Sequence, residues 1–302
     1  MELKFVVFSY NRGRFLENCI ASLEQCATNI DVTIFDDNSD DPETREAIGR
    51  LARRHRVACP GDRAPGQSKH GGLYANMQSA FEQLADDDLI CFIQDDTQLV
   101  RSVSNDEIDS WSRYFDTVEK AGIVHPAFLR GCNRASDAAS ARYDATLDGY
   151  LIDRVERSAG SYYSDILVAR TGNLRNAGWR FLDRESRNEQ QARSRFTPML
   201  YLRNPFVAWL PFAPAWRGKA RTAGLRLASR LGPSGFHPIR TMSSEERRIF
   251  MERDPAVLPV AEDFLTVDGP LLPQPWLYHP LQGRRWLKWL NSVELAVRRS
   301  FK

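Results

Sequence analysis

The sequence predicts an α/β protein, because short apolar runs alternate with amphipathic helical patterns over its first hundred residues. The expected strands cover 5–8, 32–35, 57–59 and 89–93, and the expected helices cover 14–25, 42–55 and 73–84. A strand that is followed by a helix leads into a parallel strand through a right-handed crossover. The pattern therefore indicates a parallel sheet that helices cover on both faces.

A local feature of the sequence supports each of these expected strands and helices. The run at 5–8 is uninterrupted Phe-Val-Val-Phe, as expected of a strand buried on both faces. The first helix places Phe15, Cys19, Ile20 and Leu23 on one face. Proline 42 is tolerated in the first turn of the second helix, and five apolar residues precede Gln94 in the last strand of this region.

The regularity falls after about residue 106. Helices are expected over 108–121 and 171–177, and strands over 123–124 and 166–168. The segment 198–214 is rich in aromatic residues and proline, which predicts a loop or a docking surface. We therefore expect a core of residues 1–200 and an irregular or helical C-terminal extension of residues 201–302.

Composition limits the class of protein. Hydrophobic residues make up 42% and charged residues 26%, as is usual for a soluble globular chain. The five cysteines are odd in number and form no C-x-x-C pair, which argues against a disulfide framework or a structural zinc site. A strand pattern begins at Lys4, so we expect no signal peptide, and the longest apolar stretch is too interrupted to span a bilayer. We expect a cytoplasmic protein.

Polar side chains follow three of the expected strands. Ser9, Tyr10 and Asn11 follow the first, Asp36 and Asp37 the second, and Asp95 and Asp96 the fourth. Ligands of α/β sheets bind outside the carboxyl ends of the strands. Mg²⁺ prefers oxygen ligands and commonly uses one or two carboxylates together with substrate phosphates. The sequence therefore predicts a divalent metal at Asp95 and Asp96 that bridges a diphosphate.

The acidic residues and the strand ends admit other interpretations. The acidic residues at 36–41 could simply cap the helix that begins near Pro42. A dinucleotide-binding G-x-G-x-x-G segment and a P-loop are both absent from the sequence. The contiguous Asp-Asp-Thr at 95–97 differs from the D-x-D-x-T of haloacid-dehalogenase-type phosphatases. A sugar nucleotidyltransferase would need a glycine-rich, arginine-containing loop near the N-terminus, and none is found.

Four segments in order resemble family 2 glycosyltransferases of the GT-A fold. They are Phe-Val-Val-Phe-Ser-Tyr-Asn-Arg at 5–12, Val-Thr-Ile-Phe-Asp-Asp-Asn-Ser-Asp at 32–40, the glycines and asparagine between 66 and 76, and Phe-Ile-Gln-Asp-Asp-Thr at 92–97. The resemblance covers about the first hundred residues. It implies a Rossmann-like mixed sheet, a nucleotide-sugar-binding half over 1–100 and an acceptor half over 101–200.

The resemblance also implies roles for single residues. Asp37, with Asp36 as its neighbouring candidate, would bind a uridine-like base or the ribose, and Asp95 the ribose or sugar. Asp96 would bind Mg²⁺ or Mn²⁺. The remaining donor-binding residues implied are Ser9, Tyr10, Asn11, Lys69 and Asn76, with His70 as an alternative to Lys69.

An inverting transfer also needs a general base for the acceptor hydroxyl. The segment 176–181 resembles the family's glycine-rich segment that precedes the base, and an Asn-Glu pair at 188–189 stands where the family has Glu-Asp. The base is then Glu189, which fits the spacing better, or Glu185, while Asp165 is a candidate for acceptor contact. His237 could be a further metal ligand, although a loop histidine without a role is the simpler interpretation.

Two basic amphipathic patterns lie in the extension. Ala220, Ala223, Leu227 and Leu231 form one apolar stripe among arginines, and Trp286, Leu290, Val293 and Val297 form another. Such helices suit an anionic membrane surface, but they could equally pack on the core. Because no nucleic-acid-binding motif accompanies the charge, we expect no nucleic acid partner.

The leading hypothesis is a metal-dependent, inverting glycosyltransferase of surface polysaccharide biosynthesis. It would move a hexose from a nucleotide sugar, UDP-linked by resemblance, to a glycan or lipid-linked acceptor, and would contact the inner face of the cell membrane peripherally. The alternatives are a non-catalytic or partner-dependent nucleotide-sugar-binding domain and a sugar nucleotidyltransferase.

Overall fold

A central nine-stranded mixed sheet organises the computed structural model, which describes residues 2–27, 31–59, 72–154, 159–216 and 220–300. Its order is β3-β2-β1-β4-β9-β6-β10-β8-β7, and a two-stranded sheet pairs β11 with β5. The strands are β1 (Leu3–Ser9), β2 (Asp31–Asp36), β3 (Arg56–Ala58), β4 (Leu89–Gln94), β5 (Thr97–Leu99), β6 (Val124–His125), β7 (Ala141–Asp144), β8 (Gly149–Ile152), β9 (Leu167–Arg170), β10 (Leu200–Leu202) and β11 (Val207–Trp209).

The first four strands of the central sheet are parallel, as the sequence predicts. Phe8 lies opposite Phe35 of β2 and opposite Gln94 of β4, so the carboxyl ends of these strands meet at one edge. Successive residues of β1 enter different cores: Phe5 and Val7 lie in one, Val6 and Phe8 in the other. A strand that is buried on both faces has to be apolar throughout.

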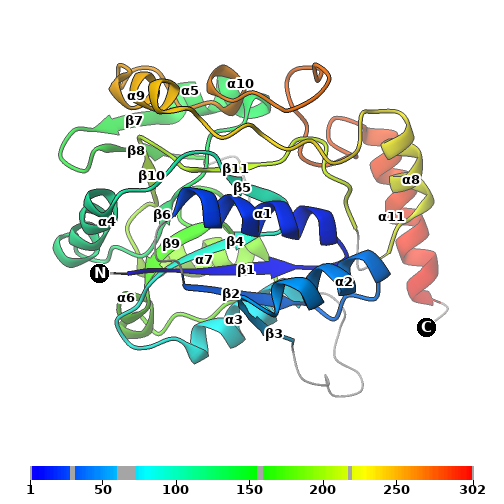
Figure 1. The fold of residues 1–302 in the computed structure, drawn as a ribbon, viewed down its shortest axis with the longest axis horizontal. Coiled ribbons are helices and arrows are strands. Elements are labelled where there is room, and N and C mark those ends of the chain that lie inside the picture. The colour runs from blue at the N-terminus through cyan, green and yellow to red at the C-terminus, as the bar shows by residue number, and fades with distance from the viewer. Residues whose placement is uncertain (1, 28–30, 60–71, 155–158, 217–219, 301–302) are drawn as a thin grey trace.

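Helices cover both faces of the sheet (Figure 1). α1, α2 and α4 contribute to the core that contains Phe5, and α3, α6 and α7 to the core that contains Phe8. The helices are α1 (Gly13–Cys26), α2 (Pro42–Leu51), α3 (Gly72–Gln83), α4 (Asn105–Thr117), α5 (Arg134–Ser140), α6 (Thr171–Asn176), α7 (Glu185–Arg195), α8 (Ala223–Arg230), α9 (Ser244–Glu252), α10 (Ala261–Phe264) and α11 (Arg285–Ser300), with a 3₁₀ turn at Gly131–Asn133.

The sheet becomes mixed beyond β4, as the family resemblance implies. β9 runs antiparallel to β4, with Phe92 opposite Leu167, and β6 runs antiparallel to β9. The start of β9 therefore lies at the same sheet edge as the ends of β1, β4 and β6. This reversal places residues from the second hundred beside the aspartates of the first hundred.

The expectation that 198–214 has no regular elements is wrong. β10 pairs with β6 and β8, and β11 pairs with β5. Both strands are buried, apart from the partly exposed Trp209, so the aromatic residues of this segment fill the core. Residues 200–209 thus complete the sheets.

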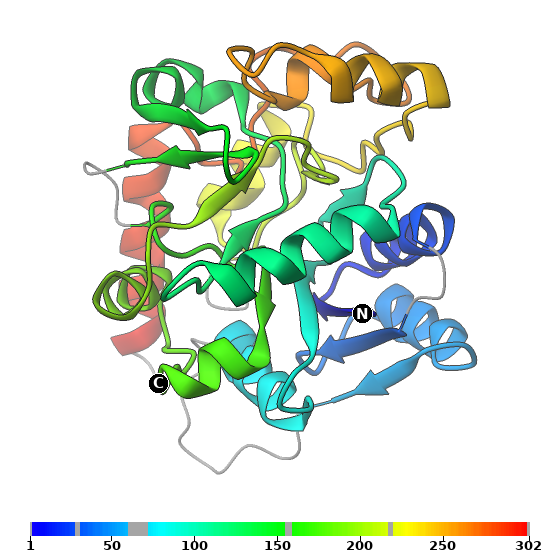
Figure 2. The same cartoon turned by 90° about the vertical axis from the view of Figure 1, so that its left-hand side faces the viewer.

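Much of the C-terminal region packs on the N-terminal elements. A third core joins Phe15 of α1, Val100 and Phe128 to Phe250, Ala261 and Trp276. α9 and α10 lie above the sheet at the top of Figure 1, and Figure 2 shows the same layer from the side.

α8 and α11 lie side by side at one end of the molecule (Figure 1). Leu225 and Ala228 of α8 pack against Leu281 and Leu287, and Thr222 donates a hydrogen bond to Asn291 at 2.7 Å. The opposite face of α11 leaves Trp286, Trp289, Val293 and Val297 exposed. The expectation that the predicted apolar stripes pack on the core is therefore wrong, because Leu227 and Leu231 of the first stripe are also exposed and the two helices pack on each other through other residues.

Candidate active site

One edge of the central sheet collects the polar residues that follow its strands. Asp37 donates its backbone N–H to the Ser9 carbonyl at 2.9 Å, and Asp95 donates its own to Phe8 at 2.9 Å. The parallel register thus holds the residues after β1, β2 and β4 within hydrogen-bonding distance of one another. Two adjoining cavities open at this edge.

Arg12 bridges the paired aspartates. Its Nη1 lies 3.1 Å from Asp95 Oδ1 and 2.6 Å from Asp96 Oδ2. Burial lowers the pKa of Arg12, but the charges of Asp96 and Asp95 outweigh burial and raise it. Asp95 also accepts hydrogen bonds from the Ser9 hydroxyl at 3.2 Å and the Tyr10 N–H at 3.0 Å. Burial raises the pKa of Asp95 to about 6, against the opposing charge of Arg12.

The smaller cavity, of about 260 Å³, lies over the ends of β1 and β4. Its opening is flanked by Tyr10 and Trp216, whose rings meet edge to face with centroids 5.9 Å apart. Asp37 and the buried Asn76 line its floor. Of the predicted donor-binding residues, the structure brings together Ser9, Tyr10, Asp37, Asn76 and Asp95 around this cavity.

Glycine at position 72 permits the approach of α3 to Asp37. A Cβ atom there would lie 2.0 Å from Asp37 Oδ2. Any larger residue would displace either the helix or the carboxylate. The glycine therefore preserves the shape of the smaller cavity.

Asn11 and Asp36 do not line this cavity. The Asn11 side chain accepts hydrogen bonds from the backbone N–H groups of Asp40 and Asp41, and donates one to the Asp40 carboxylate at 2.6 Å. Asp36 accepts from the backbone and hydroxyl of Ser39 at 2.7 and 2.6 Å. Both residues shape the loop that presents Asp37, and Lys69 and His70 lie outside the described residues.

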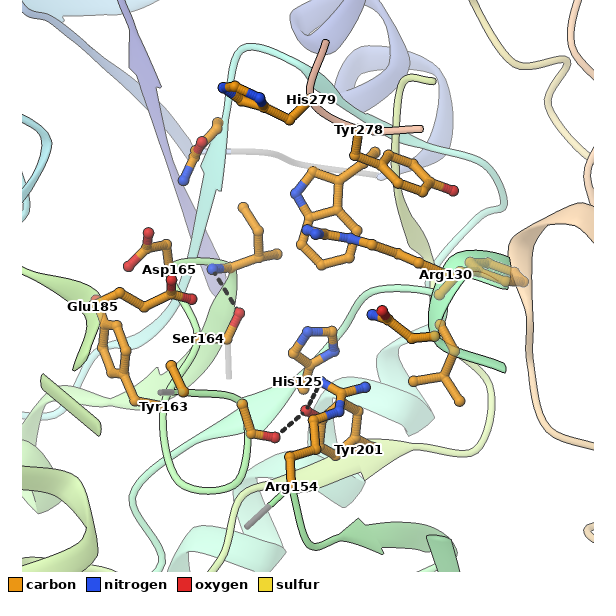
Figure 3. Close-up of a pocket in the computed structure, with 18 of the residues that line it drawn as sticks. His125, Arg130, Arg154, Tyr163, Ser164, Asp165, Glu185, Tyr201, Tyr278 and His279 are labelled. Atoms are coloured by element: carbon orange, nitrogen blue, oxygen red, sulfur yellow. Dashed lines mark hydrogen bonds between the residues drawn. The ribbon is translucent and has the colours of Figure 1, made fainter. Parts of the chain in front are cut away.

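The larger cavity, of about 490 Å³, adjoins the smaller one at Gln94. Asp96 lines it together with Asp165, Glu185, Arg130 and His125. Figure 3 shows Asp165 and Glu185 on one wall and Arg130 projecting from the opposite wall. The carboxylates and the guanidinium thus face a common space.

Asp165 and Glu185 are neighbouring carboxyl groups in this wall. Burial, followed by the charge of Glu185, raises the pKa of Asp165 to about 7. Asp165 accepts a hydrogen bond from the Tyr74 hydroxyl at 3.2 Å, while its other oxygen is buried without a partner among the described residues. Glu185 is accessible at the rim of the cavity, yet partial burial raises its pKa, against the charge of Arg130. Asp165 is therefore suited to hold a proton near neutral pH, and Glu185 holds a proton more readily than a free carboxyl group does.

Glu189 occupies a different place from Glu185, one turn further along α7. It is buried, and its carboxylate accepts hydrogen bonds from the N–H groups of Gly160, Tyr162 and Tyr163 at 2.9 to 3.1 Å. These bonds fix the loop that leads to Asp165. The structure therefore favours Glu185 over Glu189 as the base, because the Glu189 carboxylate lies outside the cavity lining and already binds three donors.

The N-terminal third of the chain is similar in sequence to a known protein family. Residues 5–106 match the family model "Glycosyl transferase family 2". This segment, about a third of the chain, is similar to a family 2 glycosyltransferase domain. The match spans both aspartate-containing strand ends, so Asp37, Asp95 and Asp96 all lie inside it. The comparison with curated proteins gives no sequence match.

Solved structures that align with this chain share little sequence identity with it. TarS of S. aureus aligns over 69% of this chain with a TM-score of 0.49 and 15% sequence identity. Its 1–349 segment in complex with UDP aligns with a TM-score of 0.47 and 14% sequence identity. The chain spans 36% and 60% of these two chains. The mannosyltransferase PcManGT from Pyrobaculum calidifontis, in complex with GDP-Man and Mn²⁺, aligns with a TM-score of 0.42 and 12% sequence identity. This alignment covers 99% of this chain and 75% of the mannosyltransferase.

The site has oxygen ligands that fit a divalent cation at Asp96. One Asp96 oxygen is buried without a hydrogen-bond partner among the described residues. Those residues contain no group of three or more His, Cys, Asp or Glu side chains suited to a metal. A site with one or two carboxylates that is completed by substrate phosphates is the usual Mg²⁺ arrangement. Asp96, with Asp95 beside it, fits that arrangement.

The histidine expected beside the metal is not placed there. His237 donates its ring N–H to the Pro233 carbonyl at 2.7 Å and packs against Phe212, away from both cavities. His125 and His279 line the larger cavity instead. Burial lowers the pKa of His125 well below its usual value, so this ring is neutral. His279 is therefore a better candidate than His237 for contact with a metal or a diphosphate.

Several site residues escaped the sequence prediction. Arg130 follows β6, and Tyr201 lies in β10. The sequence pattern does not show where these two short strands lie in the order of the sheet. Trp216 lies two residues beyond the aromatic segment 198–214, for which a loop or a docking surface was expected. Asp165 is not among the missed residues, since its place beside a short expected strand already made it a candidate for acceptor contact.

We expect Asp165→Asn to change stability in a pH-dependent way. A folded-state pKa of about 7 means that the folded protein retains a proton that the unfolded chain loses near pH 4. The free energy of unfolding therefore falls as the pH rises from about 4 to about 7. The variant carries no such charge, so it should exceed the wild type by on the order of 1–3 kcal/mol at pH 8 and by little at pH 4.

Urea unfolding at both pH values measures this difference. Asp183→Asn, at an exposed carboxylate near the start of α7, is the control and should show no such trend. Equal differences for Asp165→Asn at pH 4 and pH 8 would show that Asp165 ionises normally.

Proposed function

We propose that this glycosyltransferase moves a sugar from a nucleotide sugar to an acceptor hydroxyl, with inversion at the anomeric carbon. The observation that supports this proposal is the pair of adjoining cavities. The smaller is lined by Asp37, Asn76 and Asp95, and the larger by Asp165 and Glu185, and they meet at Gln94 to Asp96. A donor that lay in the first with its diphosphate at Asp96 would direct its sugar into the second.

The donor is proposed to be UDP-linked. Tyr10 and Trp216 offer aromatic surface for a base. Asp37 is placed to accept hydrogen bonds from the base or ribose, and Asp95 from the ribose or sugar. Mg²⁺ or Mn²⁺ at Asp96, when bound, would act as a Lewis acid that neutralises charge on the departing diphosphate.

The acceptor side is proposed to work through Glu185. The acceptor oxygen attacks the anomeric carbon, the bond from that carbon to the diphosphate oxygen breaks, and Glu185 takes the hydroxyl proton. Asp165 lines the same wall and interacts electrostatically with Glu185. Glu189 holds the 160–163 loop, so it positions Asp165 without contacting the substrates.

The acceptor is proposed to be a glycan or a lipid-linked sugar of surface polysaccharide assembly, reached at the inner face of the cell membrane. In the described part of the chain, no helix is long and apolar enough to cross a bilayer. α11 exposes 56% of Trp286 and 69% of Trp289, with Val293 and Val297 on the same face. Arg285 and Lys288 are exposed beside the tryptophans. Tryptophan with flanking cations is suited to the interface of an anionic bilayer.

Removing the exposed tryptophans should weaken binding to anionic vesicles. We expect the wild type to sediment with phosphatidylglycerol vesicles, and Trp286→Ser/Trp289→Ser to lose at least tenfold in affinity, because two large apolar side chains no longer insert. Leu271→Ser, at a fully exposed leucine outside α11, should bind like the wild type. No sedimentation of the wild type would refute the membrane contact and leave the transferase proposal intact.

The proposal of sugar transfer is tested by a thermal-shift panel of nucleotide sugars with and without Mn²⁺. A ligand that binds only the native state raises its stability. The panel also separates the non-catalytic alternative, which would bind a donor without releasing its nucleoside diphosphate, from the nucleotidyltransferase alternative, which would release pyrophosphate from a nucleoside triphosphate.

A further inference from the structure

Arg130 is a cation that faces the larger cavity. Its guanidinium carbon lies 3.8 Å from the centroid of the Trp209 ring and 5.0 Å from that of Tyr278. Figure 3 shows it extending from its wall into the cavity, toward the side that carries Asp165 and Glu185. The two rings fix the direction of a side chain that would otherwise be flexible.

No carboxylate of the described residues forms an ion pair with Arg130. The other arginines near the site are paired: Arg12 with Asp95 and Asp96, and Arg154 with Asp137 at 2.8 Å. Glu185 contributes to the electrostatics of Arg130 but lies beyond ion-pair distance. Burial lowers the pKa of Arg130, which shows that its environment disfavours an uncompensated charge.

We propose that Arg130 binds an oxyanion of the acceptor, such as a phosphate group, so that the acceptor is an anionic molecule rather than a neutral glycan. This inference rests on the proposed function, since it assigns the acceptor side of the same site. Arginine presents a planar pair of donors that matches a phosphate or carboxylate. With its anion on Arg130, an acceptor spanning the cavity presents a hydroxyl to Glu185 on the opposite wall.

The neighbours of Arg130 agree with such a ligand. Asn133 and Tyr278 also line the cavity and offer an amide and a hydroxyl. Burial lowers the pKa of the nearby His125 well below its usual value, so Arg130 rather than this ring supplies the positive charge on this part of the cavity. The cation thus lies across the cavity from the carboxylates, which suits a ligand with an anion at one end and a hydroxyl at the other.

Binding of phosphate probes in the presence of UDP and Mn²⁺ tests the proposal, because UDP then fills the donor's diphosphate site. Calorimetry is run with glycerol, glycerol 3-phosphate and geranyl phosphate. We expect one or both phosphates to bind the wild type and glycerol to bind at least tenfold more weakly. Preference for glycerol 3-phosphate indicates a polyol phosphate, and preference for geranyl phosphate a lipid phosphate; either result supports the proposal.

Arg130→Gln should weaken phosphate binding at least tenfold and leave UDP binding within twofold of the wild type. Arg134→Gln is the matched control, since Arg134 lies nearby in the chain, at the start of α5, but pairs with Asp263 on the surface. Failure of both phosphates to bind the wild type, or loss of UDP affinity in Arg130→Gln with phosphate binding retained, overturns the proposal. Failure of UDP itself to bind would instead refute the proposed donor.

Discussion

Asp96→Asn is expected to reduce sugar transfer by about 10²- to 10³-fold, the usual loss when one group that stabilises transition-state charge is removed. Asparagine has nearly the same shape as aspartate, so the fold should be kept. The variant lacks the negative charge that would hold a divalent cation at the diphosphate. Release of UDP from the donor, followed at several Mn²⁺ concentrations, measures the effect, and the remaining activity should depend less on Mn²⁺.

Asp86→Asn is the control for this change. Asp86 lies just before β4, at the opposite end from Asp96, and its side chain is 97% exposed in a surface pair with Arg175. We expect unchanged turnover there, because exposed ion pairs contribute little. Wild-type turnover in Asp96→Asn would exclude Asp96 from the donor site.

Glu185→Gln and Glu189→Gln should fail in different ways, although the residues are one helical turn apart. Glu185→Gln removes the proposed base, so transfer should fall about 10²- to 10⁴-fold with little change in melting temperature. Glu189→Gln weakens the acceptor of three buried N–H groups, so it should destabilise the fold by about 1–3 kcal/mol. It should retain more transfer activity than Glu185→Gln.

Two measurements on the same preparations distinguish the two variants: the rate of transfer at saturating donor, and the melting temperature. Donor binding should survive in both variants, because neither glutamate lines the smaller cavity. If Glu185→Gln melts early and retains activity while Glu189→Gln is folded and inactive, the assignment is reversed.

The donor half of the site was largely predictable because it follows directly from strand ends. Five consecutive apolar residues followed by Gln-Asp-Asp have few interpretations other than a buried strand with a polar site at its end. The parallel strands then bring Ser9, Asp37 and Asp95 to one edge of the sheet. Local patterns also indicated α1, α3 and α6 within one or two residues. The sequence could not show which cation pairs with Asp95 and Asp96. Arg12 belongs to the motif at 5–12, but its bridge to both aspartates is a tertiary contact.

The acceptor half was less predictable because it depends on strand order. β9 lies between β4 and β6, and only this order places Asp165 and Arg130 across one cavity. Spacing within the chain favoured Glu189 as the base, whereas burial and three N–H donors give that carboxylate a structural task. Periodicity also could not tell which face of α11 packs: Leu287 and Asn291 turn inward and both tryptophans turn outward.

The thermal-shift panel tests the central claim of a nucleotide-sugar site most directly. In Mn²⁺ one UDP-sugar should raise the melting temperature of the wild type by several degrees, since a ligand at about one hundred times its Kd adds about 2.7 kcal/mol of stability. The shift should be smaller without Mn²⁺ and should disappear in Asp37→Ala. Absence of any shift with UDP-, GDP- or TDP-sugars in the presence of Mn²⁺, from a folded wild-type protein, would contradict it.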